Sequence, residues 1–141
     1  MSESAVYRAS LVSHRAALTL LRSVEHLASQ QQLAVCAAVV DAMGVTRAFI
    51  AMDGAAAIAQ TMCVQKAKAS LLGMPSAELG DALAGNTIHL SSFAANPELS
   101  LMGGGVPIVV DDQLIGALGV GGASVAQDID IAQRALASLL E

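Results

Sequence analysis

The chain has 141 residues and a formal net charge of −5, since 12 acidic residues outnumber seven basic ones. Its few Lys and Arg residues form no cluster, which excludes a phosphate-tracking nucleic-acid surface and an anionic membrane surface as partners. No apolar run approaches the roughly 20 residues of a membrane-spanning helix, and the N-terminal residues lack the apolar block of a signal peptide. We therefore expect one cytoplasmic domain over residues 1–141.

The composition is 55% apolar, yet the chain contains no Trp, one Tyr and two Phe. The core must therefore be built from Ala, Val, Leu, Ile and Met, which allow helices and strands to pack closely. Only 13% of the residues are charged, so much of the apolar surface is expected to be buried against other copies. This composition favours a homo-oligomer over a monomer.

Helical periodicity predicts a first helix over residues 7–32. At 100° per residue, Arg22 and His26 share a solvent-facing stripe, and Leu20 lies on the opposite, buried face. His14 is expected at the margin of the apolar face. Each histidine is either a structural residue or a ligand for a metal ion.

Two short apolar segments, residues 33–40 and 45–52, follow the helix on either side of the turn at residues 41–44. Their β-branched residues and the turn between them predict an antiparallel hairpin. Cys36 lies inside the first strand. Cys36 and Cys63 are expected to be free thiols because we expect a cytoplasmic protein, and their spacing defines no zinc site.

A second helix is predicted over residues 55–72, with Asp53 as its N-terminal cap. On this helix Lys66 stands in the middle of a small apolar face that includes Ile58 and Met62. A lysine in such a place extends its ammonium group to the edge of the packing, forms a structural ion pair, or binds an anionic ligand. The pattern leaves these alternatives open.

Ser76 is predicted to cap a short helix over residues 77–84. Residues 85–102 have no clear period and predict an irregular loop of 18 residues, which is long for a compact domain and is more often functional than filler. His89 lies in this loop, where it either lines a pocket or is simply exposed.

Gly103, Gly104 and Gly105 precede two apolar runs, residues 106–110 and 114–120, which predict a second hairpin. Three consecutive glycines allow either a sharp turn into the strand or a close approach of backbone amides to an anion. Without a following Lys and Ser or Thr they do not form a P-loop.

Ser124 and Gln127 form a capping-box signature for a terminal helix. Asp128 falls at the edge of the apolar stripe of this helix, where it can meet a basic group from another element. The order of elements is helix, hairpin, two helices, loop, hairpin, helix. This order predicts an α+β sandwich with an antiparallel sheet and helices packed on it.

Five sequence blocks resemble the GlcG/HbpS-like family, also called the haem-degrading-like or PduO C-terminal domain. From about residue 11 onward they stand in the family's order and spacing. They are AVVDAMG, MDGA, QKAKAS, GGGVPIVVDDQLIGALGVGGAS and QDIDIAQ. The resemblance implies a profilin-like α/β/α sandwich with a central antiparallel sheet, and assembly into oligomers from dimers to octamers. The chain departs from the family pattern at Ala51 and Gly121, where the family usually has Arg and Ser.

The resemblance further implies a small oligomeric protein that binds haem or a related tetrapyrrole, as an accessory to a catabolic pathway. Haem iron would be held by His14 or His26, because histidine is a usual axial ligand of haem iron. Other candidate ligand-binding residues are Lys66, Asp53, His89, Gly103, Gly104 and Gly105.

A second hypothesis is a small lyase or isomerase that needs no cofactor. In this hypothesis Lys66 is the Schiff-base or proton-transfer group, and Asp128 or Asp53 is its carboxylate partner. The amides of Gly103–Gly105 would then stabilise an oxyanion. The sequence leaves open which of the two hypotheses holds, and whether the protein is an enzyme.

Overall fold

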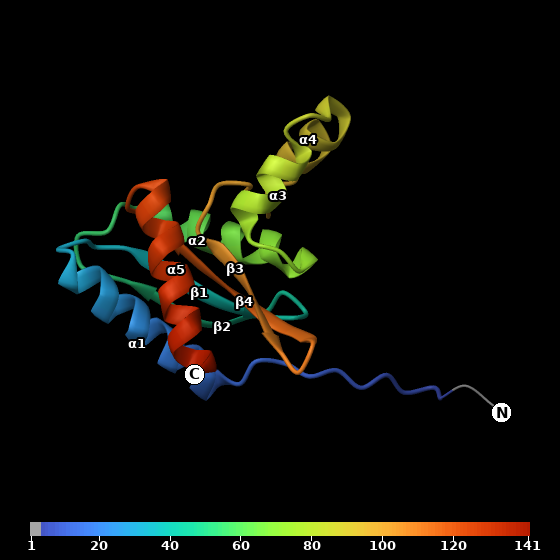
Figure 1. Cartoon of the computed structure of the whole chain (residues 1–141), viewed down its shortest axis with the longest axis horizontal. Coiled ribbons are helices and arrows are strands. Elements are labelled where there is room, and N and C mark those ends of the chain that lie inside the picture. Colours follow the sequence, from blue (N-terminus) through green and yellow to red (C-terminus); the bar gives the residue numbers. More distant parts are fainter. Residues whose placement is uncertain (1–3) are drawn as a thin grey trace.

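The computed structural model describes residues 4–141, so residues 1–3 of the expected domain lie outside the described part. A four-stranded sheet with the order β2-β1-β4-β3 forms its centre, and every neighbouring pair of strands is antiparallel (Figure 1). Both predicted hairpins are present. The strands are β1 (Cys36–Asp41), β2 (Thr46–Ala51), β3 (Gly105–Val110) and β4 (Gln113–Gly121).

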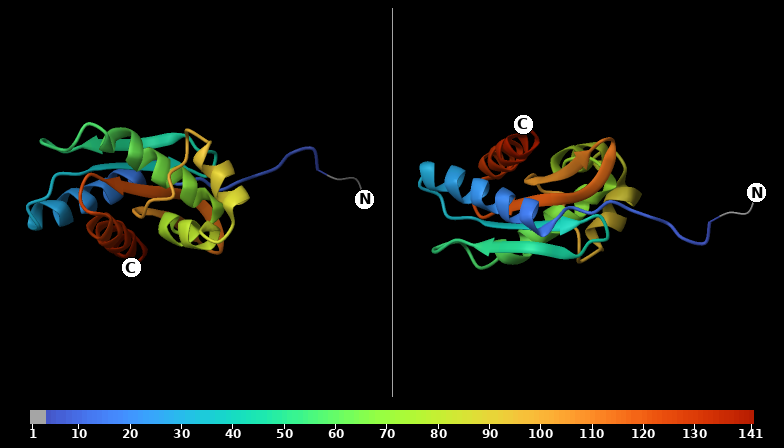
Figure 2. Two further views of the ribbon diagram at one scale, coloured as in Figure 1. Left: turned by 90° about the horizontal axis from the view of Figure 1, so that it is seen from above. Right: turned by 90° about the horizontal axis from the view of Figure 1, so that it is seen from below.

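Helices cover both faces of the sheet, which confirms the predicted α+β sandwich. Helices α1 (His14–Gln30) and α5 (Val125–Leu140) lie side by side on one face (Figure 2). Helix α2 (Ala59–Ala69), extended by the short 3-10 helix η1 (Ser70–Leu72), packs on the other face against β1 and β4. Alternation along β1 shows the two layers: Ala37 and Val39 join the α1/α5 core, whereas Cys36 and Ala38 pack with α2.

Helix α2 lies unusually close to the sheet because glycines stand below it. A Cβ added to Gly119 would meet the carbonyl oxygen of Cys63, and one added to Gly105 would meet that of Lys66. Any side chain at these two positions would push the helix away from the strands. The glycines of β3 and β4 therefore set the position of α2.

The turn of the β3–β4 hairpin consists of Asp111 and Asp112, with φ of 51° and 61°. Two consecutive positive φ values are typical of the two-residue turn that matches the twist of the strands. In the β1–β2 turn, the Oδ1 atom of Asp41 accepts hydrogen bonds from the amides of Met43 at 2.8 Å and Val45 at 3.2 Å. Polar residues thus form or stabilise both turns: Asp111 and Asp112 make the turn between β3 and β4, and the Asp41 side chain binds amides of the turn between β1 and β2.

The first helix is shorter than predicted. It begins at His14 rather than at residue 7, and Ser13 caps it by accepting a hydrogen bond from the amide of Ala16. Directly before the cap, the amide of Val12 donates to the carbonyl of Ile115 at 2.9 Å. This bond to the sheet removes the preceding segment from the helix.

Two predicted caps are wrong. Helix α2 begins at Ala59, after Ile58, and no side chain caps it, so Asp53 does not have that role. Ser76 is the first residue of α3 (Ser76–Leu83), not its cap. The Ser76 hydroxyl instead donates to the carbonyl of Met102 at 2.7 Å and accepts from the amide of Gly105 at 2.9 Å. It therefore joins α3 to the beginning of β3.

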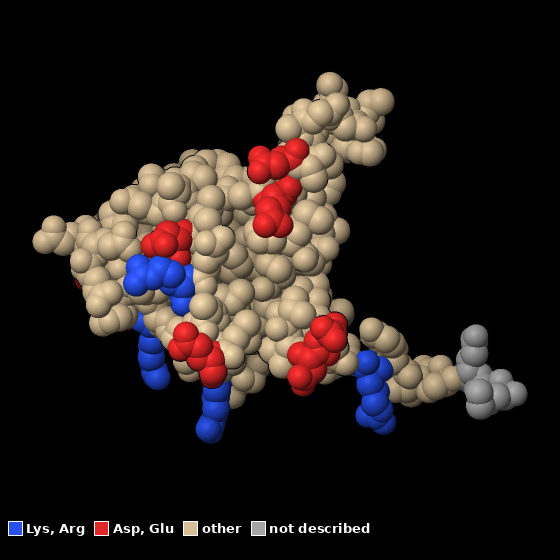
Figure 3. Space-filling view, in the orientation of Figure 1, with Lys and Arg blue, Asp and Glu red and all other residues tan. Residues whose placement is uncertain are grey.

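The segment predicted as an irregular loop contains a helix, α4 (Thr87–Ala94), which Asn86 caps by accepting from the amide of His89 at 3.0 Å. Helices α3 and α4 project from the body of the molecule (Figure 1). No residue of α4 is buried, and Ile88 is 78% exposed. The α4 end of this projection carries no charged side chain in the view of Figure 3.

The capping box at the start of α5 is confirmed. The Ser124 hydroxyl accepts from the amide of Gln127 at 3.1 Å, and the Gln127 side chain accepts from the amide of Ser124 at 3.0 Å. None of the helices within residues 4–141 is both long and apolar enough to cross a membrane.

Candidate functional site

Lys66 is the largest fully buried side chain of the described residues, with 1% of its surface exposed. Its Nζ atom donates to the carbonyl of Val120 and to Oδ2 of Asp128, each at 3.0 Å. Helix α2 thus brings the lysine to the last residues of β4 and to the first turn of α5. Lys66 lies on the predicted apolar face of its helix, and it is the basic group predicted to meet Asp128. The two residues form one ion pair.

Asp128 is equally buried, with 2% of its surface exposed. Its second oxygen, Oδ1, accepts from the amide of Ala123 at 3.1 Å, just before α5 begins. The partial positive charge of a helix N-terminus favours a carboxylate in this place. Its position in the first turn of α5 and the hydrogen bond from Ala123 hold the Asp128 carboxylate in place for its contact with Lys66.

Each of the three consecutive glycines is buried, and Gly104 lies directly against the side chain of Lys66. A Cβ on Gly104 would lie 3.1 Å from both Cδ and Nζ of Lys66, and φ of Gly104 is 128°. A Cβ on Gly103 would meet the side chain of Ile129 on α5. The amide of Gly105 already donates to Ser76, so it is not free for a ligand. Because Gly104 has no side chain, the ammonium group of Lys66 fits beside it.

A cavity of about 210 Å³ borders the ion pair. Lys66 and Asp128 are the charged residues in its wall, and the rest of the wall is mainly apolar, with Ile58, Met62 and Met102 as its largest members. The helical projection of the sequence predicted Ile58 and Met62 beside Lys66. Met102 comes from the segment between α4 and β3, and no pattern in the sequence predicts its place beside Lys66.

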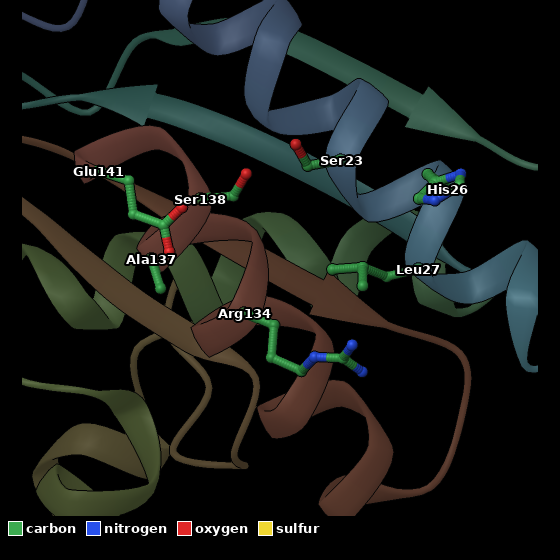
Figure 4. A pocket seen from close by; sticks show the side chains of 7 residues that line it. All are labelled: Ser23, His26, Leu27, Arg134, Ala137, Ser138 and Glu141. Atoms are coloured by element: carbon green, nitrogen blue, oxygen red, sulfur yellow. The ribbon is translucent and has the colours of Figure 1, made fainter.

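A larger groove of about 390 Å³ lies between α1 and α5. Ser23, His26 and Leu27 line it from α1, and Arg134 and Ala137 are among the lining residues from α5 (Figure 4). In Figure 4, Ser23 and Leu27 face α5, and His26 stands at the outer edge of α1. Arg134 also forms an exposed ion pair with Asp130 at 3.5 Å.

The other predicted site residues are not brought together. His14 is exposed at the first position of α1, and His89 is exposed on the projecting α4. Asp53 is exposed and lines a separate depression with Glu25. None of these three residues lines the cavity at Lys66 or the groove between α1 and α5.

Both cysteines are free and buried on the α2 side of the sheet, in one cluster with Ala38 and Ala59. Burial raises the pKa of the Cys63 thiol to about 12, and the neighbouring Cys36 adds to this effect. Burial raises the pKa of Cys36 as well. Thiols that hold their protons so strongly are poor nucleophiles and poor metal ligands.

Sequence reasoning missed the groove between α1 and α5. The solvent-facing position predicted for His26 is correct, and Arg134 on α5 is exposed as well. Their proximity depends on how the two helices pack together, and helical periodicity does not contain that information. The sequence signal that could have pointed to the groove was the presence of an exposed basic residue on each helix, His26 on α1 and Arg134 on α5.

Comparisons with known proteins agree over nearly the whole chain. A family model described as haem-degrading protein HbpS-like matches residues 12–137. Protein GlcG of Escherichia coli is 33% identical over 110 residues, which are 78% of this chain and 81% of GlcG. The crystal structure of the Klebsiella pneumoniae protein ORFY has a TM-score of 0.91 at 27% identity, covering 99% of this chain and 98% of ORFY.

The structure of PduOC in complex with haem is also similar, with a TM-score of 0.84 at 30% identity. The match covers 91% of this chain and 94% of PduOC. These similarities agree with the five blocks found in the sequence. The chain belongs to the HbpS-like family.

Proposed function

We propose that this protein binds haem or a closely related tetrapyrrole in the groove between α1 and α5. The observation that carries the proposal is the presence in one groove of a histidine, an arginine and the apolar side chains of Leu27 and Ala137. A volume of about 390 Å³ lies within the roughly 300–1,000 Å³ that is common for small-molecule sites. The haem complex of PduOC, a structure of the same fold, supports the choice of ligand.

The donor set fits haem better than a bare metal ion. Among residues 4–141, no group of three or more His, Cys, Asp or Glu side chains could hold a metal ion. A bare ion generally needs three or four protein ligands, whereas haem supplies four nitrogens of its own and needs one axial ligand. His26 would supply that nitrogen.

The remaining residues of the groove suit the other parts of the ligand. Leu27 and Ala137 offer apolar contact to the macrocycle, and Arg134 offers a cation to a propionate. Bound haem would supply redox chemistry or iron for sensing. In this arrangement the ligand is held by one nitrogen ligand, the Arg134 cation and apolar contacts, and Glu141 is the acidic residue of the lining.

A titration with hemin tests this proposal. The chain has three histidines, so single substitutions assign the iron ligand directly. We expect the wild-type protein to shift the Soret band with saturation, and His26→Ala to lose the shift. His14→Ala and His89→Ala are matched controls and should retain it. Arg134→Gln should weaken binding by less than tenfold, because an exposed charge contributes at most about 1 kcal/mol.

The absence of a Soret shift with stoichiometric hemin would contradict haem binding altogether. Loss of the shift in His14→Ala or His89→Ala, with His26→Ala unaffected, would contradict the assignment to this groove. The two results are distinguishable, since the first concerns the ligand and the second its place.

We also propose that the protein is a homo-oligomer. Ile88 on α4 is exposed, and no Lys, Arg, Asp or Glu occurs between Asp81 and Glu98. An uncharged projection with exposed apolar side chains is typical of a surface that packs against another chain. A second copy of this chain is the partner that the low charge content of the sequence favours.

A further inference from the structure

The cavity at Lys66 is separate from the groove between α1 and α5 and shares no lining residue with it. Its volume of about 210 Å³ is below the roughly 300–1,000 Å³ that is common for sites of drug-sized molecules. A tetrapyrrole is far too large for such a space. A molecule with a handful of non-hydrogen atoms fits it.

The ammonium group of Lys66 has one donor left. A lysine ammonium carries three hydrogens, and two of them are donated to Val120 and Asp128. The third has no partner among residues 4–141. Because Lys66 lines the cavity, the third hydrogen is available to an acceptor atom inside it.

The charges in the cavity wall select the kind of acceptor. Lys66 and Asp128 together are neutral, and the other lining residues carry no charge. A carboxylate ligand would bring a second negative charge beside the Asp128 carboxylate, and the wall has no second cation to compensate it. A neutral carbonyl oxygen accepts the free donor without that cost.

From the neutral ion pair, its free donor and the small apolar cavity beside it, we propose that this site binds a small aliphatic aldehyde or ketone, with which Lys66 forms an imine. Amines of lysine are the usual protein nucleophiles toward carbonyl compounds. This activity is independent of haem binding.

The step balances with the two residues present. Across their 3.0 Å contact, Lys66 gives a proton to Asp128, which leaves a neutral amine and a carboxylic acid. The amine lone pair attacks the carbonyl carbon, and the oxygen takes up one of the two protons of the attacking nitrogen to give a neutral carbinolamine. Asp128 returns its proton to the departing hydroxyl group, so that water leaves. The product is a protonated imine on Lys66 beside the Asp128 carboxylate, and no oxidant or reductant takes part.

Trapping with a reductant tests the proposal, because the chain has only two lysines. The protein is incubated with butanal and cyanoborohydride, which reduces the imine to a stable amine, and the modified residue is found by peptide mass spectrometry. Lys68 is the internal control, since it is partly exposed and its ion pair with Glu98 lies at the surface. We expect Lys66 to be modified at least tenfold faster than Lys68, with saturation at increasing butanal concentration.

A purely structural ion pair predicts the opposite order. A lysine that is 1% exposed and already paired would then be protected, so modification of Lys66 slower than that of Lys68 overturns the proposal. Modification without saturation overturns it too, because it would show reaction without a binding site.

Two variants complete the test. Asp128→Asn keeps the size of the side chain but removes the proton acceptor, and should slow the modification of Lys66 by about 100-fold or more.

If the Asp128→Asn variant fails to fold, Ile58→Trp still tests the proposal. Ile58 is 69% exposed at the cavity wall, so a larger side chain there should block Lys66 without disturbing the core. Leu72→Trp, at an exposed position outside the cavity wall, is its control and should leave both lysines unchanged. Equal modification in both tryptophan variants and the wild type would also overturn the proposal.

Discussion

The backbone of Gly104 touches the side chain of Lys66 so closely that a Cβ on the glycine would lie 3.1 Å from the ammonium nitrogen. On its other side, the same Cβ would meet the carbonyl oxygen of Val120, which accepts a hydrogen bond from Lys66. The glycine, the lysine and the strand carbonyl therefore occupy one tightly packed point. The buried charge exists there because the residue beside it has no side chain.

Gly104→Ala should lower the free energy of unfolding by about 2–5 kcal/mol. The φ of 128° is strained for any residue with a Cβ, and the added methyl group would also crowd Lys66 and Val120. Gly44→Ala is the matched control: φ there is 83°, and nothing lies within 4 Å of the added Cβ. We expect Gly44→Ala to lower the free energy of unfolding by about 1–2 kcal/mol, from backbone strain alone. Urea denaturation of the two variants measures the difference, and equal losses would contradict the packing described here.

Lys66→Met should lower the free energy of unfolding by about 3–5 kcal/mol, because it leaves the buried Asp128 carboxylate without its partner. Lys68→Met, which breaks a partly exposed pair with Glu98, should change it by at most about 1 kcal/mol. Adding Asp128→Leu to Lys66→Met should recover part of the loss, since no buried charge then remains. A fully stable Lys66→Met variant would indicate that the pair does not contribute to folding.

Stability should fall at alkaline pH because of Cys63. Its pKa in the folded protein is about 12, above the ordinary value of 9.0, so the unfolded chain releases a proton that the folded chain keeps. This contribution is therefore fully present below pH 9 and is lost as the pH rises toward 12. Three pKa units at about 1.36 kcal/mol each set an upper limit of about 4 kcal/mol. Thermal melts of wild type and Cys63→Ala between pH 8 and pH 11 should show a steeper loss in the wild type, and parallel curves would refute this origin.

Ile88→Lys should weaken self-association. The side chain lies on the uncharged α4 projection, and a charge placed there would be buried without a partner if another subunit covers it. Sedimentation velocity at micromolar concentration should show a smaller species for this variant than for wild type. Leu72→Lys, an exposed position on the body of the molecule, is the control and should sediment like wild type. Monomeric wild-type protein in the same experiment would remove the basis of the prediction.

Local sequence signals predicted the elements that local interactions determine. The two-residue turn at Asp111 and Asp112 and the capping box at Ser124 each depend on residues within a few positions of one another. The position of Lys66 on an apolar helix face is equally local. Such features follow from periodicity and turn chemistry without knowledge of the tertiary fold.

Contacts between distant segments could not be predicted in the same way. Asp128 lies 62 residues from Lys66, and the sequence alone left Asp53 open as an alternative partner. The structure selects Asp128 because α5 starts directly after β4, next to the carbonyl of Val120. Helix α4 was missed for another reason: none of its residues is buried, so it shows no apolar period to detect.

The glycines under α2 also determine which parts of the molecule can move when the cavity opens. Because Gly105 and Gly119 bring the helix backbone into contact with the strands, α2 has no layer of side chains on which to slide or tilt. Access to Lys66 then depends on side chains at the cavity wall, where Met62 of α2 and Met102 of the segment before β3 are long and flexible. Because the packing under α2 fixes the depth of Lys66, we expect a small molecule to enter and leave by side-chain rotation at the exposed part of the wall, without displacement of the helix.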